Sequence, residues 1–382
     1  MSFEFATAAR VVFGRPLAEI GPELAAFQGP YLLVTGKDPS RAAALRALLE
    51  ERRQHVLLFP VSGEPTLDVA RAGATLARGD CRSVVAIGGG AVLDAAKAIA
   101  ALMTNDGDPL DYVEVIGGGR PLAHPAAPVV AIPTTAGTGS EVTRNAVLSS
   151  PAHRVKVSLR STGMLPRLAW IDPALTLSMS PELTASTGMD ALSQTMEAFV
   201  CVAPNPLTDP LCREALSRAA HALPRACAAG GDLEARTDMS YVSLVGGLAL
   251  ANARLGAVHG FAAPLGGMFE AAHGALCAAL LAPVMRVNID ALRRRAASHP
   301  SLARYEEVAR LLTGRSDARA EDGAAWVDDL CARIHVPRLR AYGVAESDFA
   351  AASEKAAAAS SMKGNPIPLD GAEREEILRR AL

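Results

Sequence analysis

The sequence predicts an α/β N-terminal domain with a doubly wound parallel sheet, followed by an all-α C-terminal domain. Short apolar runs alternate with amphipathic stretches between residues 30 and 133. From about residue 181 onward, β-branched runs give way to Ala- and Leu-rich helical periodicity. The chain of 382 residues is also longer than one ordinary hydrophobic core requires. We therefore expect two domains, residues 1–178 and 179–382, with the boundary near residues 174–181.

Four apolar runs are predicted to be strands that are buried on both faces: Tyr31–Thr35, His55–Phe59, Ser83–Ile87 and Pro128–Ile132. Helices are predicted between them at about 39–53, 65–79 and 91–103. The third is the clearest, because its apolar residues recur at intervals of three and four. Alternation of strands and helices is typical of a Rossmann-like sheet, and such sheets bind ligands beyond the carboxyl ends of their strands.

Composition and charge argue against several classes of function. The net charge is −2 and basic and acidic residues are interspersed, so we expect no nucleic-acid or membrane-surface partner. Aromatic residues make up 4% of the chain, which argues against base stacking. The most apolar stretch, 242–266, is interrupted by Asn252, Arg254 and His259. It is therefore predicted to be a buried core helix, since a membrane span needs roughly 20 apolar residues with few charges.

The cysteines and the N-terminus indicate a cytoplasmic protein. None of the six cysteines is paired as CxxC, so we expect neither a thiolate zinc site nor a redox dithiol. Scattered cysteines in a long chain are typical of a reducing compartment. The first residues, Met-Ser-Phe-Glu-Phe, lack the basic and apolar regions of a signal peptide.

A glycine triplet, Gly88-Gly89-Gly90, separates the third predicted strand from the third predicted helix. Without side chains, the backbone can approach a pyrophosphate closely, and the helix start offers free N–H groups and a positive dipole. A tight connection without a ligand is the alternative. Asp94 and Lys97 lie within the helix, and Lys97 is interpreted either as functional or as a solvated partner of Asp94.

A second loop, residues 133–143, follows the fourth predicted strand and mixes glycine with small hydroxyl residues. Backbone and hydroxyl groups of this kind donate hydrogen bonds to phosphate or ribose oxygens. The loop contains neither a GxSxG nucleophile motif nor a Walker lysine, which argues against an acyl hydrolase and an NTPase. Two such loops favour a dinucleotide over a single phosphate. A purely structural loop is the alternative.

The helical half contains a candidate metal site. Asp190 and Gln194 are four residues apart and share a helix face, with Glu197 on an adjoining part of the same stripe. His259 and His273 flank a Gly- and Pro-rich segment that we expect to form a turn. One histidine alone is more often structural, but two near a buried aspartate favour a metal. Carboxylate and imidazole donors suit zinc or ferrous iron, and an open position would polarise a substrate oxygen.

Together with the tail Gly364-Asn-Pro-Ile-Pro368, these stretches resemble the iron-containing (group III) alcohol dehydrogenase family over nearly the whole chain. The resemblance implies the architecture shared with dehydroquinate synthase, with NAD(P) and a divalent metal held between the two domains. It implies reversible hydride transfer with a small alcohol or aldehyde, and a homodimer. The cofactor-binding positions that it implies are Gly88, Gly89, Gly90, Asp94, Thr134, Thr135, Thr138, Thr143, Lys156 and Leu175.

The resemblance also implies metal ligands and catalytic residues, but the match is incomplete. The family uses one aspartate and three histidines, which correspond to Asp190, His259, His273 and, in place of the third histidine, Gln194. Another family histidine near the nicotinamide corresponds to Ala263. A glutamine oxygen is a weaker ligand for zinc or iron than imidazole. Neither Gln194 nor Ala263 can relay a proton.

The end of the first predicted strand bears on the choice of cofactor. The resemblance places a carboxylate at Gly36 in relatives that prefer NAD. Here Gly36 is followed by Lys37, with Arg41 nearby, which leaves space and positive charge for the 2′-phosphate of NADP. Asp38 could still reach the ribose, so NAD stays open while the residues favour NADP.

Three functions are alternatives to metal-dependent hydride transfer. The first is a metal-independent reductase with His259 or His273 as general acid. The second is a nucleotide-binding homologue with impaired catalysis, against which the intact glycine loops argue. The third is a dehydroquinate synthase-like lyase, whose sugar-phosphate-binding basic residues are not evident between residues 190 and 273.

Overall fold

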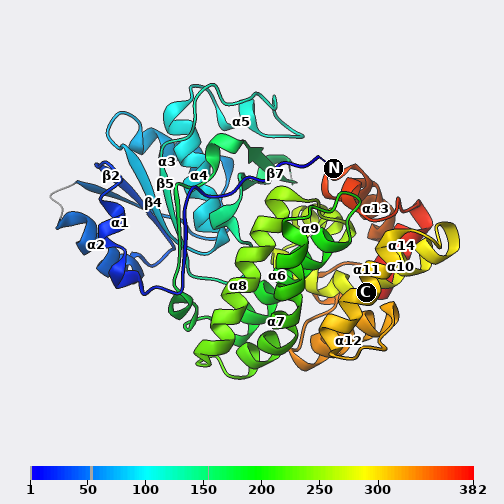
Figure 1. Cartoon of the computed structure of the whole chain (residues 1–382). Helices are drawn as coiled ribbons and strands as arrows, with labels where there is room; N and C mark the ends of the chain where they lie inside the picture. The colour runs from blue at the N-terminus through cyan, green and yellow to red at the C-terminus, as the bar shows by residue number, and fades with distance from the viewer. Residues whose placement is uncertain (1, 52–54, 154) are drawn as a thin grey trace. The chain divides into compact units, whose positions relative to one another are not determined.

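The computed structural model describes residues 2–51, 55–153 and 155–382, and these form two compact units (Figure 1). The α/β unit comprises residues 6–135 and 139–176. The helical unit comprises residues 177–382, a short segment at 136–138 and the N-terminal residues up to Phe5. The predicted fold class, a parallel α/β sheet with an all-α C-terminal part, is confirmed.

The main sheet of the α/β unit has six strands in the order β1-β8-β5-β4-β2-β3, and every neighbouring pair is parallel. The four predicted strands are all present, but two short strands were missed. With three and four residues, β1 and β8 are too short for a recognisable apolar period. The strands are β1 (Val11–Phe13), β2 (Tyr31–Thr35), β3 (Val56–Pro60), β4 (Ser83–Gly88), β5 (Val129–Pro133) and β8 (Leu168–Ile171).

Helices cover both faces of this sheet, because alternate residues of each strand point to opposite sides. Leu33 and Val85 pack with Leu45 of α2 (Ala43–Glu50) on one face. Leu32 and Val84 pack on the other face with α4 (Gly90–Thr104). Helix α3 (Leu67–Ala77) packs beside α4. The sheet is therefore doubly wound, as predicted.

Two details of this unit differ from the prediction. The helix expected at 39–53 is a 3-10 turn, Pro39–Ala42, followed by α2, and its residues 52 and 53 lie outside the described part of the chain. A separate antiparallel pair, β6 (Asn145–Ser150) and β7 (Val155–Arg160), follows the second loop and was not predicted. Its buried face packs against α4, with Leu148 and Val157 beside Leu102.

The helical unit is organised around α6 (Pro181–Val200), which is buried on nearly all sides from Thr184 onward. Such an all-round burial is typical of a central helix. It packs against α7 (Thr208–Ala228), α8 (Leu233–Asn252) and α10 (His273–Arg295). The other helices are α9 (Ala257–Met268), α11 (Pro300–Thr313), α12 (Ala320–Arg333), α13 (Phe349–Ala358) and α14 (Gly371–Ala381). Figure 1 shows them from green to red.

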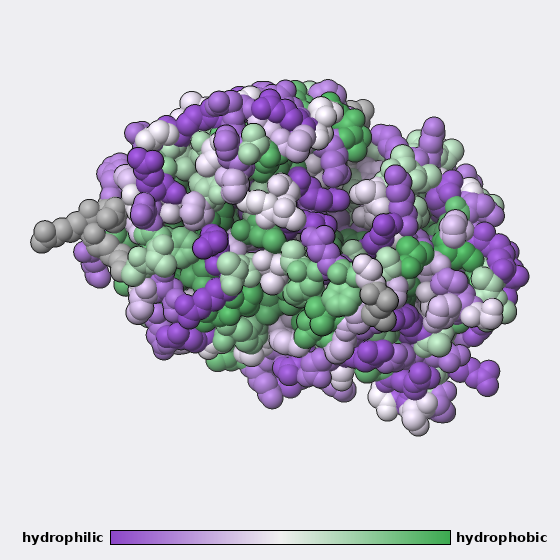
Figure 2. Space-filling model, turned by 45° about the horizontal axis from the view of Figure 1, so that its top comes forward, coloured by the Kyte–Doolittle hydropathy of each residue, from purple (hydrophilic) through white to green (hydrophobic). Residues whose placement is uncertain are grey.

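The apolar stretch at 242–266 is buried, but it is not one helix as expected. It is divided between α8 and α9, whose axes differ by 96°. The turn expected between His259 and His273 is also wrong in extent, because α9 continues helically through Pro264 to Met268. By length and composition α10 could cross a membrane, but 78% of its most apolar window is buried inside the protein, as in a core helix. Hydrophilic residues are distributed across the face shown in Figure 2.

Candidate functional site

The predicted cofactor-binding loops lie side by side at the carboxyl edge of the sheet. Thr35 of β2 is opposite Ile87 of β4, and Gly88 is opposite Pro133 of β5. The strand order reverses between β2 and β4, and this kind of switch point is where such sheets bind nucleotides. The segments that follow the three strands and meet there are Gly36, 88–90 and 134–135.

The glycine loop fits closely against its surroundings. A Cβ atom on Gly88 would lie 2.6 Å from the Val92 side chain, and one on Gly89 would lie 3.2 Å from Oγ1 of Thr135. Gly89 is the N-cap of α4, whose first N–H groups have no acceptor within the helix. The loop therefore brings bare backbone to a helix start, where an anionic phosphate is stabilised.

Asp94 and Lys97 brace the second loop. The Lys97 ammonium is buried, with 1% of the residue exposed, and lies 3.1 Å from the Asp94 carboxylate. It donates to the Ser140 carbonyl and to Oγ1 of Thr143, both at 2.9 Å. Asp94 accepts hydrogen bonds from Oγ of Ser140 at 2.5 Å and from the Val147 amide at 3.1 Å. The interpretation of Lys97 as a solvated residue is therefore wrong.

The remaining predicted cofactor residues lie in three settings. Leu175 follows β8 at the carboxyl edge and packs on the sheet core. The ammonium of Lys156, on β7, forms an ion pair with Glu64 at 2.6 Å. Thr138 falls in the short segment at 136–138 that belongs to the helical unit. The structure thus gathers most of the predicted positions at the strand ends, with Lys156 on the separate hairpin.

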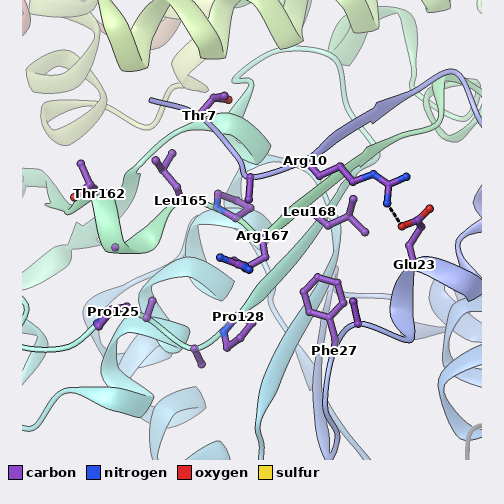
Figure 3. A pocket seen from close by; sticks show the side chains of 16 residues that line it. Thr7, Arg10, Glu23, Phe27, Pro125, Pro128, Thr162, Leu165, Arg167 and Leu168 are labelled. Carbon is purple, nitrogen blue, oxygen red and sulfur yellow. Dashed lines mark hydrogen bonds and ion pairs between the residues drawn. The ribbon is translucent and has the colours of Figure 1, made fainter. Parts of the chain in front are cut away.

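A cavity of about 590 Å³ opens at the opposite, amino-terminal edge of the sheet (Figure 3). Its lining residues precede their strands, as Pro128 precedes β5 and Arg10 precedes β1, and Arg10 is paired with Glu23. Because dinucleotides bind at the carboxyl ends of the strands in doubly wound sheets, this cavity is distinct from the cofactor loops.

The helical unit brings four potential metal ligands together. One donor atom each from Asp190, His259, His273 and Cys277 lies within 4.8 Å of the others. Oδ1 of Asp190 is 3.3 Å from Nε2 of His259 and 3.8 Å from Nε2 of His273. Three of the four metal ligands predicted from the sequence, Asp190, His259 and His273, are in this group, together with a cysteine that the prediction did not include. A thiol can therefore lie beside imidazole and carboxylate donors without a CxxC motif.

The four donors come from three helices. Asp190 lies in the middle of α6, His259 in the first turn of α9, and His273 is the first residue of α10, with Cys277 one turn later on the same face. Gly274 permits the close approach of α10 to α6, because a Cβ there would lie 2.3 Å from the Ser186 carbonyl oxygen. The spacing of His273 and Cys277, at i and i+4, is the signal that could have identified the cysteine.

Glu197 orients His259. Its Oε2 atom is 2.7 Å from Nδ1 of His259, and its Oε1 atom accepts a hydrogen bond from the Val258 amide at 2.6 Å. One carboxylate therefore caps α9 and fixes the imidazole. The Nε2 atom of the ring faces Asp190 and Cys277. Bonding of the far ring nitrogen to a carboxylate is typical of metal-binding histidines.

The tail motif supports the same helix start. The side-chain oxygen of Asn365 accepts hydrogen bonds from the Ala257 amide at 3.1 Å and from Asn288 at 3.0 Å. Its amide donates to the Ile367 carbonyl and to Asn288. The buried Asn365 is therefore a structural part of the support of α9.

The electrostatic environment of the cluster favours positive charge on its histidines. Burial raises the pKa of the Asp190 carboxyl, but the hydrogen bond from His259 and the charges of the two histidines outweigh burial and lower it. Burial lowers the pKa of His259, but the Cys277 charge and the hydrogen bonds with Asp190 and Glu197 raise it well above its ordinary value. The pKa of His273 is raised in the same way, against burial, by Cys277 and Asp190. A field that favours protonated imidazole also favours a bound cation.

Gln194 and Ala263 stand where the resemblance implies histidines. Gln194 is buried, and its Nε2 atom donates a 2.9 Å hydrogen bond to the Gly137 carbonyl, which holds the segment at 136–138 against α6. Ala263 lies one turn after His259 on α9 and is half-buried. The side-chain nitrogen of Gln194 is thus hydrogen-bonded to the backbone.

A cavity of about 990 Å³ in the helical unit borders the other face of α10. Ala275 and Ala278 line it, and at 100° per residue they point away from the side that carries His273 and Cys277. The cavity is therefore separate from the cluster.

Comparison with known proteins identifies the family. The family described as iron-containing alcohol dehydrogenase matches residues 8–173, and its C-terminal counterpart matches residues 184–382. The chain belongs to the iron-containing alcohol dehydrogenase family. It is 33% identical to choline dehydrogenase of Bacillus subtilis (strain 168) over 377 residues, which cover 97% of this chain and 92% of the relative. It is 38% identical to 1,3-propanediol dehydrogenase of Klebsiella pneumoniae over 315 residues, or 81% and 78% of the two chains.

Solved structures give the same result. A crystal structure of 1,3-propanediol oxidoreductase superposes with a TM-score of 0.91 at 32% identity and covers 100% of both chains. The resemblance read from the sequence is confirmed, and with it the general activity. This family member is an NAD(P)-dependent alcohol oxidoreductase.

Proposed function

We propose that the enzyme interconverts a small alcohol and its aldehyde or ketone, and that Asp190, His259 and His273 hold a divalent iron or zinc ion. The cluster of these three side chains in a member of this family carries the proposal. Residues 1–178 would bind the dinucleotide and residues 179–382 the metal and substrate. Choline, propanediol and hydroxybutyrate are substrates named for relatives and are reasonable first compounds to assay.

The donor set fits a catalytic metal. A bound divalent ion would polarise the substrate oxygen and stabilise its alkoxide form while hydride is exchanged with the nicotinamide. The hydrogen bond to Glu197 favours the tautomer of His259 that carries its proton on Nδ1. The lone pair of Nε2 is then available to bind the ion. The His273 side chain is 33% exposed, whereas Asp190 is 5% exposed, so His273 marks the accessible side of the cluster. Without imidazoles at Gln194 and Ala263, a proton would come from water or a ribose hydroxyl.

We also propose that the enzyme prefers NADP. Gly36 is half-buried at the strand ends, and the exposed residues Lys37 and Arg41 are close in sequence. Among the described residues, no atom lies within 4 Å of a Cβ placed on Gly36. Asp38, the residue that could bind a ribose diol, instead accepts hydrogen bonds from the Ser40 amide at 3.0 Å and hydroxyl at 2.7 Å. Space together with two cations favours a 2′-phosphate over a diol.

The test is an assay of purified enzyme with NADPH and NADH over a panel of short aldehydes, before and after removal of metal by a chelator. We expect turnover to be lost on chelation and restored by Fe²⁺ or Zn²⁺. Activity that survives complete chelation and is lost in His259→Ala would support the metal-independent reductase. Cofactor binding without turnover on the whole panel would support the impaired homologue.

The oligomeric state is proposed from the family, and the location from the cysteines and the N-terminal residues. We propose a cytoplasmic homodimer, and the six cysteines, all free thiols, suit a reducing compartment. Light scattering after size-exclusion chromatography should give twice the chain mass of 39.6 kDa.

A further inference from the structure

We infer that Cys277 is a metal ligand, so that this enzyme holds its ion with Asp190, His259, His273 and a thiolate instead of a third imidazole. The inference rests on the proposed metal-dependent function and specifies its ligand set. The histidine absent at position 194 would thus be replaced by a sulfur from another helix, α10, and the number of protein donors would stay at four.

The distances fit one ion. Sγ of Cys277 is 3.7 Å from Nε2 of His273 and 3.9 Å from Nε2 of His259. The carboxylate oxygen of Asp190 is 3.3 and 3.8 Å from the same two nitrogens. Around a tetrahedral zinc ion with ordinary bond lengths, donor atoms are separated by roughly 3.3–3.6 Å. These four distances lie within a few tenths of an ångström of that range, and all four donor atoms lie within 4.8 Å of one another.

The scaffold holds this arrangement in place. Cys277 is fully buried and lies one helical turn after His273, so the two side chains project from the same face of α10. Gly274, which has no Cβ to meet the Ser186 carbonyl, lets α10 approach α6 closely. Gln194, the competing fourth donor, has its amide nitrogen bonded to the Gly137 carbonyl and would offer only a neutral oxygen. A thiolate is the stronger ligand for zinc.

The sulfur changes the chemistry of the ion. On binding, the thiol proton is released to solvent and a metal–sulfur bond forms, while the oxidation state of the metal is unchanged. Asp190 and the thiolate then neutralise both charges of the ion, whereas one aspartate and three histidines would leave one positive charge. A soft ligand also favours zinc or cobalt over ferrous iron. We therefore expect zinc to be retained in preference to iron.

Cobalt substitution tests the ligand directly. The full-length protein is stripped of metal and loaded with Co²⁺, and its near-ultraviolet and visible spectrum and metal content are recorded. We expect one Co²⁺ per chain and a thiolate-to-cobalt charge-transfer band in the wild type. Cys277→Ser should abolish the band and weaken Zn²⁺ binding roughly a hundredfold or more in a chelator competition. Cys227→Ser, a matched change of a half-buried thiol on α7, and Gln194→Ala should both keep the band.

The outcomes separate this inference from the proposed function. Stoichiometric Co²⁺ in the wild type without a thiolate band overturns the sulfur ligand, even if the enzyme is active. Loss of metal in Gln194→Ala with full retention in Cys277→Ser assigns the fourth position to Gln194 instead. Failure of the proposed function would appear as absent NAD(P)-dependent turnover, irrespective of the spectrum. Should Cys277→Ser fail to fold, sulfur scattering in the X-ray absorption spectrum of the wild-type zinc protein decides the same question.

Discussion

The carboxylate of Glu197 lies 2.7 Å from Nδ1 of His259, and the same carboxylate accepts a hydrogen bond from the Val258 amide at the start of α9. Helix α6 thus provides both Asp190, a residue of the candidate metal site, and the carboxylate that contacts the histidine opposite it. The two functions lie seven residues apart, on nearly the same face of the helix. One side chain therefore contacts both the start of α9 and Nδ1 of His259.

Glu197→Gln should weaken metal binding by about 10- to 100-fold, the usual effect of losing a group that orients a metal ligand. The glutamine amide can keep its bond to Val258, but its NH₂ group would face the N–H at Nδ1. Relief of that clash moves the proton to Nε2 and removes a metal donor. Chelator competition with Zn²⁺ measures the effect. Glu182→Gln, at an exposed position in the first turn of α6, is the control, and equal affinities of the two variants would contradict the orienting role.

Gly36→Asp should shift the cofactor preference from NADP toward NAD. In the part of the chain that the structure describes, no atom lies within 4 Å of a Cβ at this position, so the side chain has space. The new carboxylate would accept hydrogen bonds from the ribose diol and repel the 2′-phosphate. We expect the ratio of kcat/KM for the two cofactors to change by about tenfold or more, corresponding to roughly 1.4 kcal/mol. Unchanged ratios, with normal turnover, would mean that the adenosine ribose lies elsewhere.

Lys97→Met should destabilise the α/β unit by about 3–5 kcal/mol, because it leaves the Asp94 carboxylate without its buried partner. The second loop loses two further hydrogen bonds, so the KM for the dinucleotide should rise. Urea unfolding and initial rates measure the two effects. Lys355→Met, an exposed change in α13, should do neither. Adding Asp94→Asn should recover part of the stability, and no recovery would argue against the ion pair as the cause.

Glu141 should make the stability of the α/β unit fall as the pH rises from about 4.5 to 7. Burial raises the pKa of this carboxyl to about 7, against the opposing charge of Lys97. The folded protein therefore binds the proton more tightly than the unfolded chain, so the stabilisation is complete below the unfolded pKa and is lost as pH passes the folded pKa. The difference amounts to about 3 kcal/mol.

Glu141→Gln should remove this dependence. Urea unfolding of the wild type and the variant at pH 5 and pH 8 measures it, and the variant should gain stability relative to the wild type at the higher pH. Glu51→Gln, at an exposed position after α2, serves as the control. A constant difference between Glu141→Gln and the wild type at both pH values would mean that the carboxyl titrates normally.

The sequence alone determined the fold class, four of the six parallel strands and the glycine loops between strands and helices. Burial on both faces, helical periodicity and strand–loop–helix order are local properties, so they can be read from short windows of residues. The sequence also predicts Asp190, His259 and His273 as metal ligands, and the structure groups their donor atoms. Their residue types and the neighbouring motifs indicated metal chemistry without knowledge of the packing.

Only the tertiary structure shows Cys277 beside these three residues and Glu197 behind His259. Asp190 and His259 are 69 residues apart in the sequence, and their distance depends on how α6, α9 and α10 pack. Lys97 illustrates the same limit, since the residues that bury it lie more than 40 positions away in the second loop. A sequence shows which side chains can bind a metal or carry a charge. Packing of distant helices decides which of them share one site, because contact and burial are properties of the whole fold.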